Sequence, residues 1–446
     1  MKTRLRDACR RMNLWVGGVL ATQQDMSALF WARGVERYLK PDGTIAFVLP
    51  FAAINRPAFA GLRHGDFGTV QTRIVEAWDL ARVRPIFGGA IGTTSTCALF
   101  ARREAAAPLP PRIEVLSGTL PRRDANEEEA DRSLQHGVEQ WPRITTLEGA
   151  SPYRARFRQG ASLSPRRFFL VEREPAGRFS ENPAAPRVRG RISSLDKSPW
   201  KAVEPSRGPI EVDTLRPVLL GESIAPFLLL RLALGVMPIV AGTIVDAGQA
   251  ADAGYRHLGA WLFDAEAKWR THSNKRPDGT SRMTLSERVD HMRGLSTQLA
   301  PPQIRVVYTK AGTLLSAALL DDPRVIVDTK AYWAPARDMN EAHYLLSVLN
   351  SSTVLKQIIP MQPRGWRDPR DFDNLVWELR INEFDRRNGL HRELSVAAQV
   401  AERVAAAVVL REGSHFMRQR RAIRDALAAD GVAARIDELV SRLLSG

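Results

Sequence analysis

The chain has 446 residues and a formal net charge of +15, with 64 Lys and Arg against 49 Asp and Glu. This length is enough for about two or three domains with apolar cores, and the basic charge favours a polyanionic partner, although a compositional bias toward Arg and Ala is an alternative source of that charge. Cys9 and Cys97 are the only cysteines, which excludes a disulfide framework and a cysteine-based zinc site and indicates a cytoplasmic protein.

The first predicted element is an amphipathic helix over residues 22–39. Apolar side chains recur there at three- and four-residue spacing, which is the pattern of one buried helical face. Residues 22–25 have the Thr-x-x-Asp pattern of a helix start. The side chains expected on the buried face are Met26, Leu29, Phe30, Val35, Tyr38 and Leu39.

A turn and a strand are predicted to follow this helix. Pro41 cannot continue the helix, and Asp42 and Gly43 supply a turn. Residues 44–49 form a short, nearly continuous apolar run. Such a run predicts a strand covered on both faces, as in a parallel sheet. The chain from the helix to Pro50 therefore resembles one step of an open α/β sheet.

Two later apolar runs, residues 73–78 and 95–101, predict an antiparallel hairpin at the end of the same sheet. The segment between them is rich in glycine at Gly88, Gly89 and Gly92. A nucleotide-binding glycine loop would instead follow a first strand and open a helix. We therefore interpret this segment as a hairpin loop.

The middle of the chain is expected to be a region of short strands broken by Pro and Gly. One apolar segment in it, residues 224–245, is almost long enough to span a bilayer. Arg231 lies near its middle and Pro226 and Pro238 interrupt it, so we favour a buried strand and helix pair over a membrane span. Strands are expected over residues 168–172, 238–245, 304–309 and 325–328.

The end of the chain, residues 391–444, has helical periodicity, with Gly431 separating two amphipathic pieces. We expect these helices to pack on the chain itself, and a partner protein is the alternative. The eight histidines show no paired ligand spacing, so no metal site is expected.

Several motifs resemble one known family, the bacterial site-specific DNA methyltransferases that transfer a methyl group from S-adenosylmethionine to the N6 amine of adenine. Residues 23–30, 38–50, 51–56 and 94–100 are similar to the second half of the catalytic domain of that family. Similarity to its specificity region covers residues 182–186, 195–201, 215–222, 332–335, 340–346, 361–364 and 372–378. The resemblance thus extends over nearly the whole chain.

The motifs that carry the chemistry in this family are missing from the sequence. Family members have a glycine loop for the methyl donor and an Asn/Asp-Pro-Pro-aromatic loop that holds the target amine, both upstream of the residues that match 22–50. Here Asn182-Pro183 is followed by Ala, and the pairs Pro110-Pro111 and Pro301-Pro302 lack the flanking residues of that motif. We therefore expect no catalytic residues in this chain, and no binding of S-adenosylmethionine by the chain alone.

The resemblance implies that double-stranded DNA is the partner, and three segments combine cations with aromatic rings as base and phosphate contacts require. Loop 361–370 has three Arg and one Trp, and the other two segments surround residues 197–201 and 330–333. The alternative for each is an Arg-rich surface with a Trp that anchors the core. The DNA-binding candidates are Arg364, Trp366, Arg367, Arg370, Lys330, Trp333, Lys197, Trp200 and Lys201.

Pro50, Phe51 and Asn55 follow the carboxyl end of the strand at 44–49, the position where ligands of open α/β sheets bind. If the missing half of the domain were supplied, these residues would border the pocket for an extruded adenine. A purely structural role for the three residues is the alternative.

The predicted fold is α/β. It has a partial Rossmann-like methyltransferase sheet at 1–104, an α+β target-recognition domain at 105–390 and a C-terminal helical segment at 391–446. Two functions remain open. The chain is part of an adenine DNA methyltransferase of restriction-modification or phage-defence type, inactive without a separate N-terminal methyltransferase piece, or it is a non-catalytic DNA-binding protein or remnant.

Overall fold

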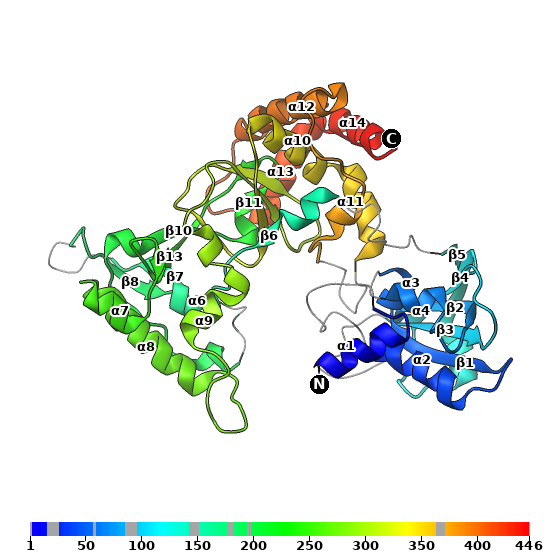
Figure 1. Ribbon diagram of the computed structural model, residues 1–446. Helices are drawn as coiled ribbons and strands as arrows, with labels where there is room; N and C mark the ends of the chain where they lie inside the picture. Colours follow the sequence, from blue (N-terminus) through cyan, green and yellow to red (C-terminus); the bar gives the residue numbers. More distant parts are fainter. Residues whose placement is uncertain are drawn as a thin grey trace. The chain divides into compact units, whose positions relative to one another are not determined.

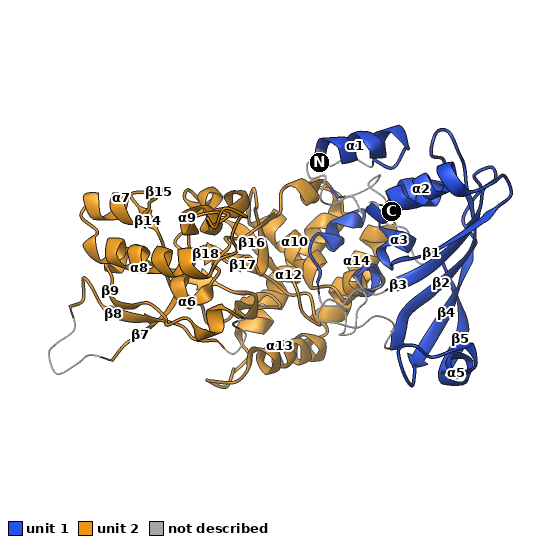
Figure 2. Ribbon diagram, turned by 90° about the horizontal axis from the view of Figure 1, so that it is seen from below, with its two compact units in different colours: residues 1–151, 356–380 blue, residues 152–355, 381–446 orange. Residues whose placement is uncertain are grey.

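The computed structural model describes residues 2–15, 26–56, 59–84, 96–141, 151–175, 182–193, 196, 198–362 and 371–445. The chain forms two compact units (Figure 2). Unit 1 contains Met1–Ser151 and Lys356–Arg380, and unit 2 contains Pro152–Leu355 and Ile381–Gly446. The fold is mixed α/β, with several small sheets and C-terminal helices (Figure 1). The domain boundaries near residues 104 and 390 stay predictions.

Unit 1 is built around one five-stranded sheet in the order β1-β3-β2-β4-β5. Strand β3 is antiparallel to both β1 and β2, whereas β4 is parallel to β2 and antiparallel to β5. The elements of this unit are α1 (Lys2–Arg11), α2 (Met26–Tyr38), β1 (Thr44–Pro50), α3 (Ala52–Asn55), α4 (Ala60–His64), β2 (Arg73–Arg84), β3 (Thr96–Arg102), β4 (Arg112–Thr119), α5 (Glu127–Ser133), β5 (Leu134–Gln140) and the 3-10 turn Leu375–Glu378.

The strand predicted at 44–49 and the antiparallel pairing predicted for 73–78 with 95–101 are confirmed by β1, β2 and β3. The expected position of this pair at the end of the sheet is wrong, because β3 and β2 lie between β1 and β4. The expectation that the first strand is covered on both faces is wrong. Among the described residues β1 pairs only with β3, so it is an edge strand, and its residues alternate between exposed and half-buried until Leu49. An apolar run reports hydrophobicity but not which strands lie beside it, and this is why the prediction failed.

The predicted helix exists as α2, and Val35 is buried as expected, but the rest of its buried face differs from the expected one. Ala28, Trp31, Ala32 and Val35 are buried, whereas Tyr38 is 87% exposed and Phe30 is 62% exposed. The ring of Trp31 packs edge-on against Phe47 of β1, with ring centroids 5.4 Å apart. A large indole flanked by small Ala side chains sets which side of the helix approaches the sheet. The start pattern at 22–25 lies outside the described residues.

Unit 2 contains a six-stranded sheet in the order β18-β10-β13-β7-β8-β9 and a four-stranded sheet in the order β17-β16-β19-β6. Its strands are β6 (Arg158–Gln159), β7 (Leu170–Arg173), β8 (Arg187–Gly190), β9 (Arg207–Pro209), β10 (Leu215–Leu219), β11 (Ile224–Ala225), β12 (Leu228–Leu229), β13 (Ala233–Val236), β14 (Ile239–Val240), β15 (Thr243–Ile244), β16 (Arg305–Thr309), β17 (Ala317–Leu320), β18 (Ile326–Val327) and β19 (Ala331–Pro335). Its helices are α6 (Arg166–Phe169), α7 (Ala247–Asp252), α8 (Arg256–His272), α9 (Leu285–Val289), α10 (Met339–Asn350), α12 (Gly389–Ala406), α13 (Phe416–Asp430) and α14 (Val432–Ser445), and α11 (Ser352–Ile358) begins in it.

The short strands expected at 168–172, 238–245, 304–309 and 325–328 are present as β7, β14 with β15, β16 and β18. The strand and helix pair expected at 224–245 is wrong, because this segment forms only short strands from β11 to β15. Two prolines and the left-handed backbone of Phe227, Ala241 and Gly242 turn the chain too often for a helix. No helix in the described part of the chain is both long and apolar enough to cross a bilayer.

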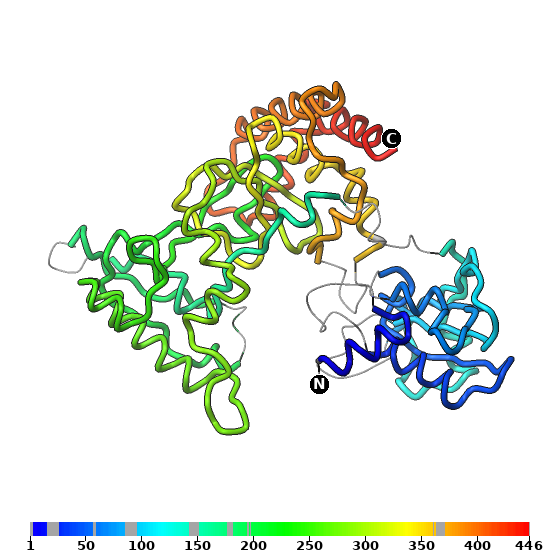
Figure 3. Tube along the Cα trace, viewed as in Figure 1, coloured from blue at the N-terminus to red at the C-terminus, as the bar shows by residue number. Residues whose placement is uncertain are grey.

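The C-terminal segment is helical, as predicted, but it has three helices rather than two. Gly431, in the left-handed conformation with φ +90°, separates α13 from α14, and a further turn at Gly413 separates α12 from α13. The apolar faces of α12 and α14 are buried, and both helices contact α10. Figure 3 shows the course of the chain through these helices to the C-terminus. Asp437 of α14 accepts hydrogen bonds from the Ser351 hydroxyl at 2.6 Å and from the Ser352 amide at 2.8 Å. This contact anchors α14 on the start of α11.

Candidate functional site

The carboxyl end of β1 leads directly into a buried turn. Phe51 and Asn55 are each 2% exposed, and Pro50 is half-buried. The Pro50 carbonyl lies 3.5 Å from Sγ of Cys97 on the neighbouring strand. Of the three predicted pocket residues, Pro50 is therefore the one with surface available, while Phe51 and Asn55 are buried.

Arg63 is a buried residue of this region that the sequence did not single out. Its Nη1 donates to the carbonyl oxygens of Ala53 at 3.0 Å and Arg56 at 2.8 Å, which closes the end of α3. Burial lowers the pKa of Arg63 to about 10, so the guanidinium is still charged at neutral pH. A buried arginine that binds only main-chain carbonyls leaves no periodic signal in the sequence.

An apolar hollow of about 840 Å³ lies between α2 and the free side of β1. Its apolar lining includes Phe30, Tyr38 and Val48, all of which are exposed, and Arg33 and Arg37 stand on the same helix. An exposed edge strand with an apolar surface beside it is a site where another strand can add. This edge and hollow together form an exposed apolar surface of unit 1.

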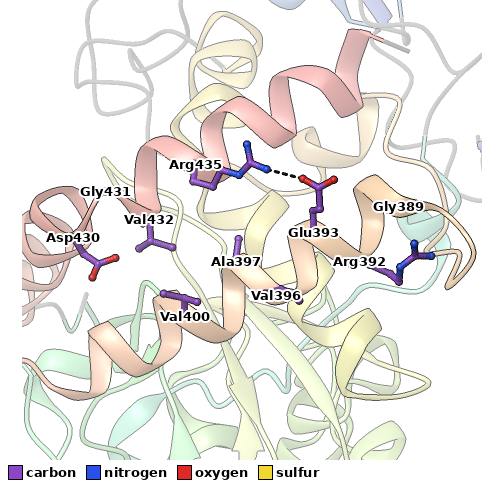
Figure 4. Close-up of a pocket in the computed structure, with 10 residues that line it drawn as sticks. All are labelled: Gly389, Arg392, Glu393, Val396, Ala397, Val400, Asp430, Gly431, Val432 and Arg435. Atoms are coloured by element: carbon purple, nitrogen blue, oxygen red, sulfur yellow. Dashed lines mark hydrogen bonds and ion pairs between the residues drawn. The ribbon is translucent and has the colours of Figure 1, made fainter.

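A second hollow, of about 590 Å³, lies in unit 2 between α12 and α14 (Figure 4). Val396, Ala397 and Val400 form its apolar floor, and Arg435 donates to Glu393 across it at 2.6 Å. Arg435 also pairs with Glu438 at 2.9 Å. The hollow is thus an apolar groove between α12 and α14, and the ion pair between Glu393 of α12 and Arg435 of α14 spans it.

Trp200, predicted to contact DNA, is half-buried in a cluster of rings. Its indole stacks on Trp269 with centroids 5.3 Å apart and planes 7° apart, and it meets Phe168 edge-on at 5.8 Å. The neighbouring Lys201 is exposed, whereas Lys197 lies outside the described residues. The Trp200 ring therefore packs against other rings, and Lys201 is the exposed side chain of the two that can contact DNA.

Lys330 and Trp333, predicted as a pair, have different environments. Lys330 is exposed, and its amide donates to the buried Asp328 carboxylate at 3.0 Å. Burial raises the pKa of Asp328, and Arg166, at 3.5 Å, opposes that effect. Trp333 is 2% exposed and lies in the core near Arg305. Its ring has no surface for a base, so we retain only Lys330 as a DNA-binding candidate here.

The remaining candidates, Arg364, Trp366, Arg367 and Arg370, lie outside the described residues. The residues on either side of that loop are well anchored in unit 1. Met361 and Phe372 are buried, and the Gln362 side chain donates to the Asp371 carbonyl at 3.2 Å. This hydrogen bond joins the two ends of the loop. Over the described ranges no three His, Cys, Asp or Glu side chains gather in a way that could hold a metal ion.

Comparison with known proteins identifies no family. No protein-family model matches the chain, and no curated protein matches it in sequence. Among solved structures it is similar to the type IIG restriction endonuclease BpuSI, with 12% identity and a TM-score of 0.28 over 98% of this chain and 52% of that one. It is also similar to a DrdV–DNA complex, with 11% identity and a TM-score of 0.33 over 90% of this chain and 42% of that one. The chain spans about half the length of these proteins or less, and the TM-scores are too low to establish a shared fold.

Proposed function

We propose that this chain recognises double-stranded DNA and carries the rear part of the catalytic domain of a site-specific adenine DNA methyltransferase, of restriction-modification or phage-defence type. The observation that supports the proposal is that β1 pairs only with β3 among the described residues of unit 1 and has an apolar hollow beside its other edge. The sequence of exactly this region resembles the second half of that catalytic domain. A Rossmann-like sheet that lacked the strands beyond β1 would have an unpaired edge at the same place.

The two faces of the unit 1 sheet are unequally covered, which supports the same idea. Side chains at Leu49, Cys97 and Leu99 point into the core that the helices share, whereas Val48 on the opposite face is 55% exposed. Open α/β sheets bury both faces under helices. A second polypeptide segment that added strands at β1 and helices on the open face would complete such a sheet.

We infer that this chain alone does not bind S-adenosylmethionine. The residues that follow β1 are Phe51 to Asn55, which are largely buried and contain no glycine where the main chain could approach a cofactor. We therefore assign no step of methyl transfer to this chain alone. Its own contribution is the binding and positioning of DNA by exposed cations, together with a wall of the base pocket at Pro50.

The test is methyl transfer to a mixed-sequence duplex from labelled S-adenosylmethionine, with the purified chain alone and with the polypeptide encoded immediately upstream. We expect no transfer by the chain alone and transfer by the mixture, if that upstream segment encodes the glycine loop and the Asn/Asp-Pro-Pro-aromatic loop. Measurable transfer by the chain alone would refute the proposal that it is catalytically incomplete.

The second candidate function is a DNA-binding protein without catalysis. The observation in its favour is the lack of both catalytic motifs in the sequence, which leaves the basic charge of +15 without an associated chemistry. Under this alternative the chain binds duplex DNA with a steep dependence on salt, and no upstream polypeptide restores methyl transfer.

A further inference from the structure

A basic hairpin projects from unit 2 beyond the end of α8, and none of the sequence predictions used it. It spans residues 273–282 and can be followed in Figures 1 and 3 between α8 and α9. Lys275 pairs with Ser281 in an antiparallel bridge, and the amide of Arg276 donates to the Thr280 carbonyl at 2.8 Å. The two arms are therefore joined by one antiparallel bridge and by hydrogen bonds between their main chains, such as the one from the Arg282 amide to the Asn274 carbonyl at 3.3 Å.

The tip of this hairpin is fixed by its own side chains. The Asp278 carboxylate accepts from the Thr280 amide at 2.9 Å and from the Thr280 hydroxyl at 2.6 Å, and these bonds lower the pKa of Asp278. Gly279 has a φ of +81°, a left-handed conformation that glycine adopts without strain. The tip is thus preformed, and ligand binding would not carry the entropic cost of ordering it.

The base of the hairpin is clamped onto the aromatic cluster of unit 2. The Ser273 and Ser281 hydroxyls lie 2.9 Å apart, and the indole N–H of Trp269 donates to the Met283 carbonyl at 2.8 Å. Trp269 also stacks on Trp200, whose ring meets His272 at 6.2 Å. The Trp200 cluster therefore fixes the direction in which the hairpin projects.

The hairpin concentrates positive charge on an exposed ribbon. Lys275, Arg276 and Arg282 are all exposed, and Asp278, whose carboxylate is used within the turn, is the one acidic residue of the segment. Among the described residues the three cations form no ion pair, although Arg276 donates to the Arg282 carbonyl at 3.1 Å and the Lys275 ammonium to the Ser281 hydroxyl at 3.5 Å. Lys201, also exposed, adjoins the Trp200 cluster at the base of the hairpin. Like charges placed this close together favour a polyanion as the partner.

We propose that this hairpin enters the major groove of duplex DNA, with Lys275, Arg276 and Arg282 contacting phosphates and base edges. The major groove admits a two-stranded ribbon, and Arg and Lys can read the two acceptors on guanine. The inference rests on the proposed DNA recognition and adds the element that performs it. The hairpin presents these cations on a segment that is held by its own hydrogen bonds.

The test compares two charge-matched variants of the full chain. In one, Lys275→Gln, Arg276→Gln and Arg282→Gln are combined. In the control, Arg411→Gln, Arg418→Gln and Arg421→Gln remove the same charge from exposed positions in and before α13, away from the hairpin in unit 2. Affinity for a mixed-sequence duplex is measured by fluorescence anisotropy over a range of salt concentrations, after circular dichroism has shown equal helix content.

We expect the hairpin variant to lose on the order of tenfold or more in affinity, and the slope of log affinity against log salt to flatten by up to about 0.9 for each lost phosphate contact. The control should stay within about twofold of the parent chain. Equal loss in both variants, or no loss in the hairpin variant, would overturn the inference while leaving DNA recognition intact. If the parent chain binds no duplex at low salt, the proposed function fails as well.

A competition experiment tests the choice of groove. Methyl green, which occupies the major groove, should displace the parent chain, and distamycin, which occupies the minor groove, should not. The hairpin variant should lose sensitivity to methyl green. Displacement by distamycin alone would overturn the assignment to the major groove.

Discussion

Glu341 provides a sharp test of how unit 2 is held together. Its carboxylate is fully buried at the start of α10 and accepts from Arg156 at 2.7 Å, from Arg337 at 3.1 Å and from the Tyr153 hydroxyl at 2.9 Å. The oxygen of Tyr153 in turn accepts from the Phe384 amide at 2.9 Å. These bonds connect three stretches of chain that are far apart in the sequence.

Replacing Glu341 by Gln keeps the shape of the side chain and removes its charge. Breaking a buried ion pair costs about 3–5 kcal/mol, and the partial exposure of both arginines reduces the expected loss of unfolding free energy to about 2–4 kcal/mol. Glu383→Gln is the matched control. Glu383 pairs with the same two arginines at 3.4 and 3.6 Å but is half-exposed, so its loss should cost less than about 1 kcal/mol.

The pH dependence has a definite sign. Burial opposes ionisation of Glu341, but the hydrogen bonds from Arg156 and Arg337 outweigh it and lower its pKa below the usual value. A carboxyl whose pKa is lower in the folded state stabilises the fold above its unfolded pKa, and this stabilisation disappears as the pH falls through the folded pKa. The difference between the parent chain and Glu341→Gln should therefore be full at neutral pH and shrink in acid.

The assay is urea unfolding followed by circular dichroism at neutral and at acidic pH. The reasoning is refuted if Glu341→Gln and Glu383→Gln lower the unfolding free energy equally. It is also refuted if the effect of Glu341→Gln grows as the pH falls.

Three further predictions concern single positions. Trp333→Ala should lower the unfolding free energy by about 3–5 kcal/mol because the ring is in the core. Lys330→Gln should change the unfolding free energy by less than about 0.5 kcal/mol but weaken duplex binding. Equal destabilisation of the two variants in urea unfolding would contradict this. Gly431→Ala should lower the unfolding free energy by about 1–2 kcal/mol through backbone strain, since the φ of Gly431 is +90° and no described atom lies within 4 Å of the added methyl group. An unchanged urea midpoint would contradict this prediction. Val48→Glu should leave the fold stable, because Val48 is exposed, but it should reduce binding of the upstream polypeptide in a pull-down at least as much as Phe30→Glu does. Normal binding of that polypeptide by both variants would argue against strand addition at β1.

Local signals predicted part of the structure correctly. The turn at Asp42 and Gly43, the strand from Thr44 to Pro50 and the helix end at Gly431 depend on residues adjacent in the chain. Pro and Gly restrict the backbone wherever they occur, and an apolar run between turns becomes a strand in many contexts. For the same reason, the hairpin of β2 and β3 could be predicted from two runs and the glycines between them.

The candidate site was less accessible to sequence reasoning. Trp200 is followed directly by Lys201 and Trp333 lies three residues after Lys330, yet the first indole is half-buried against a stacked ring and the second is buried in the core. The cations of the 273–282 hairpin are no more conspicuous in the sequence than other basic residues of this Arg-rich chain. Their exposure depends on the turn at Asp278 and on the clamp at Trp269.

The sequence by itself determined the positive charge, the positions of several strands, the helical character of the C-terminal segment and the lack of both catalytic motifs, because these are properties of composition and of neighbouring residues. Only the tertiary structure decided that β1 is an edge strand, which face of α2 is buried and which cations project into solvent. Burial and strand order arise from contacts between residues far apart in the chain, and no local pattern encodes which of two apolar faces finds a partner.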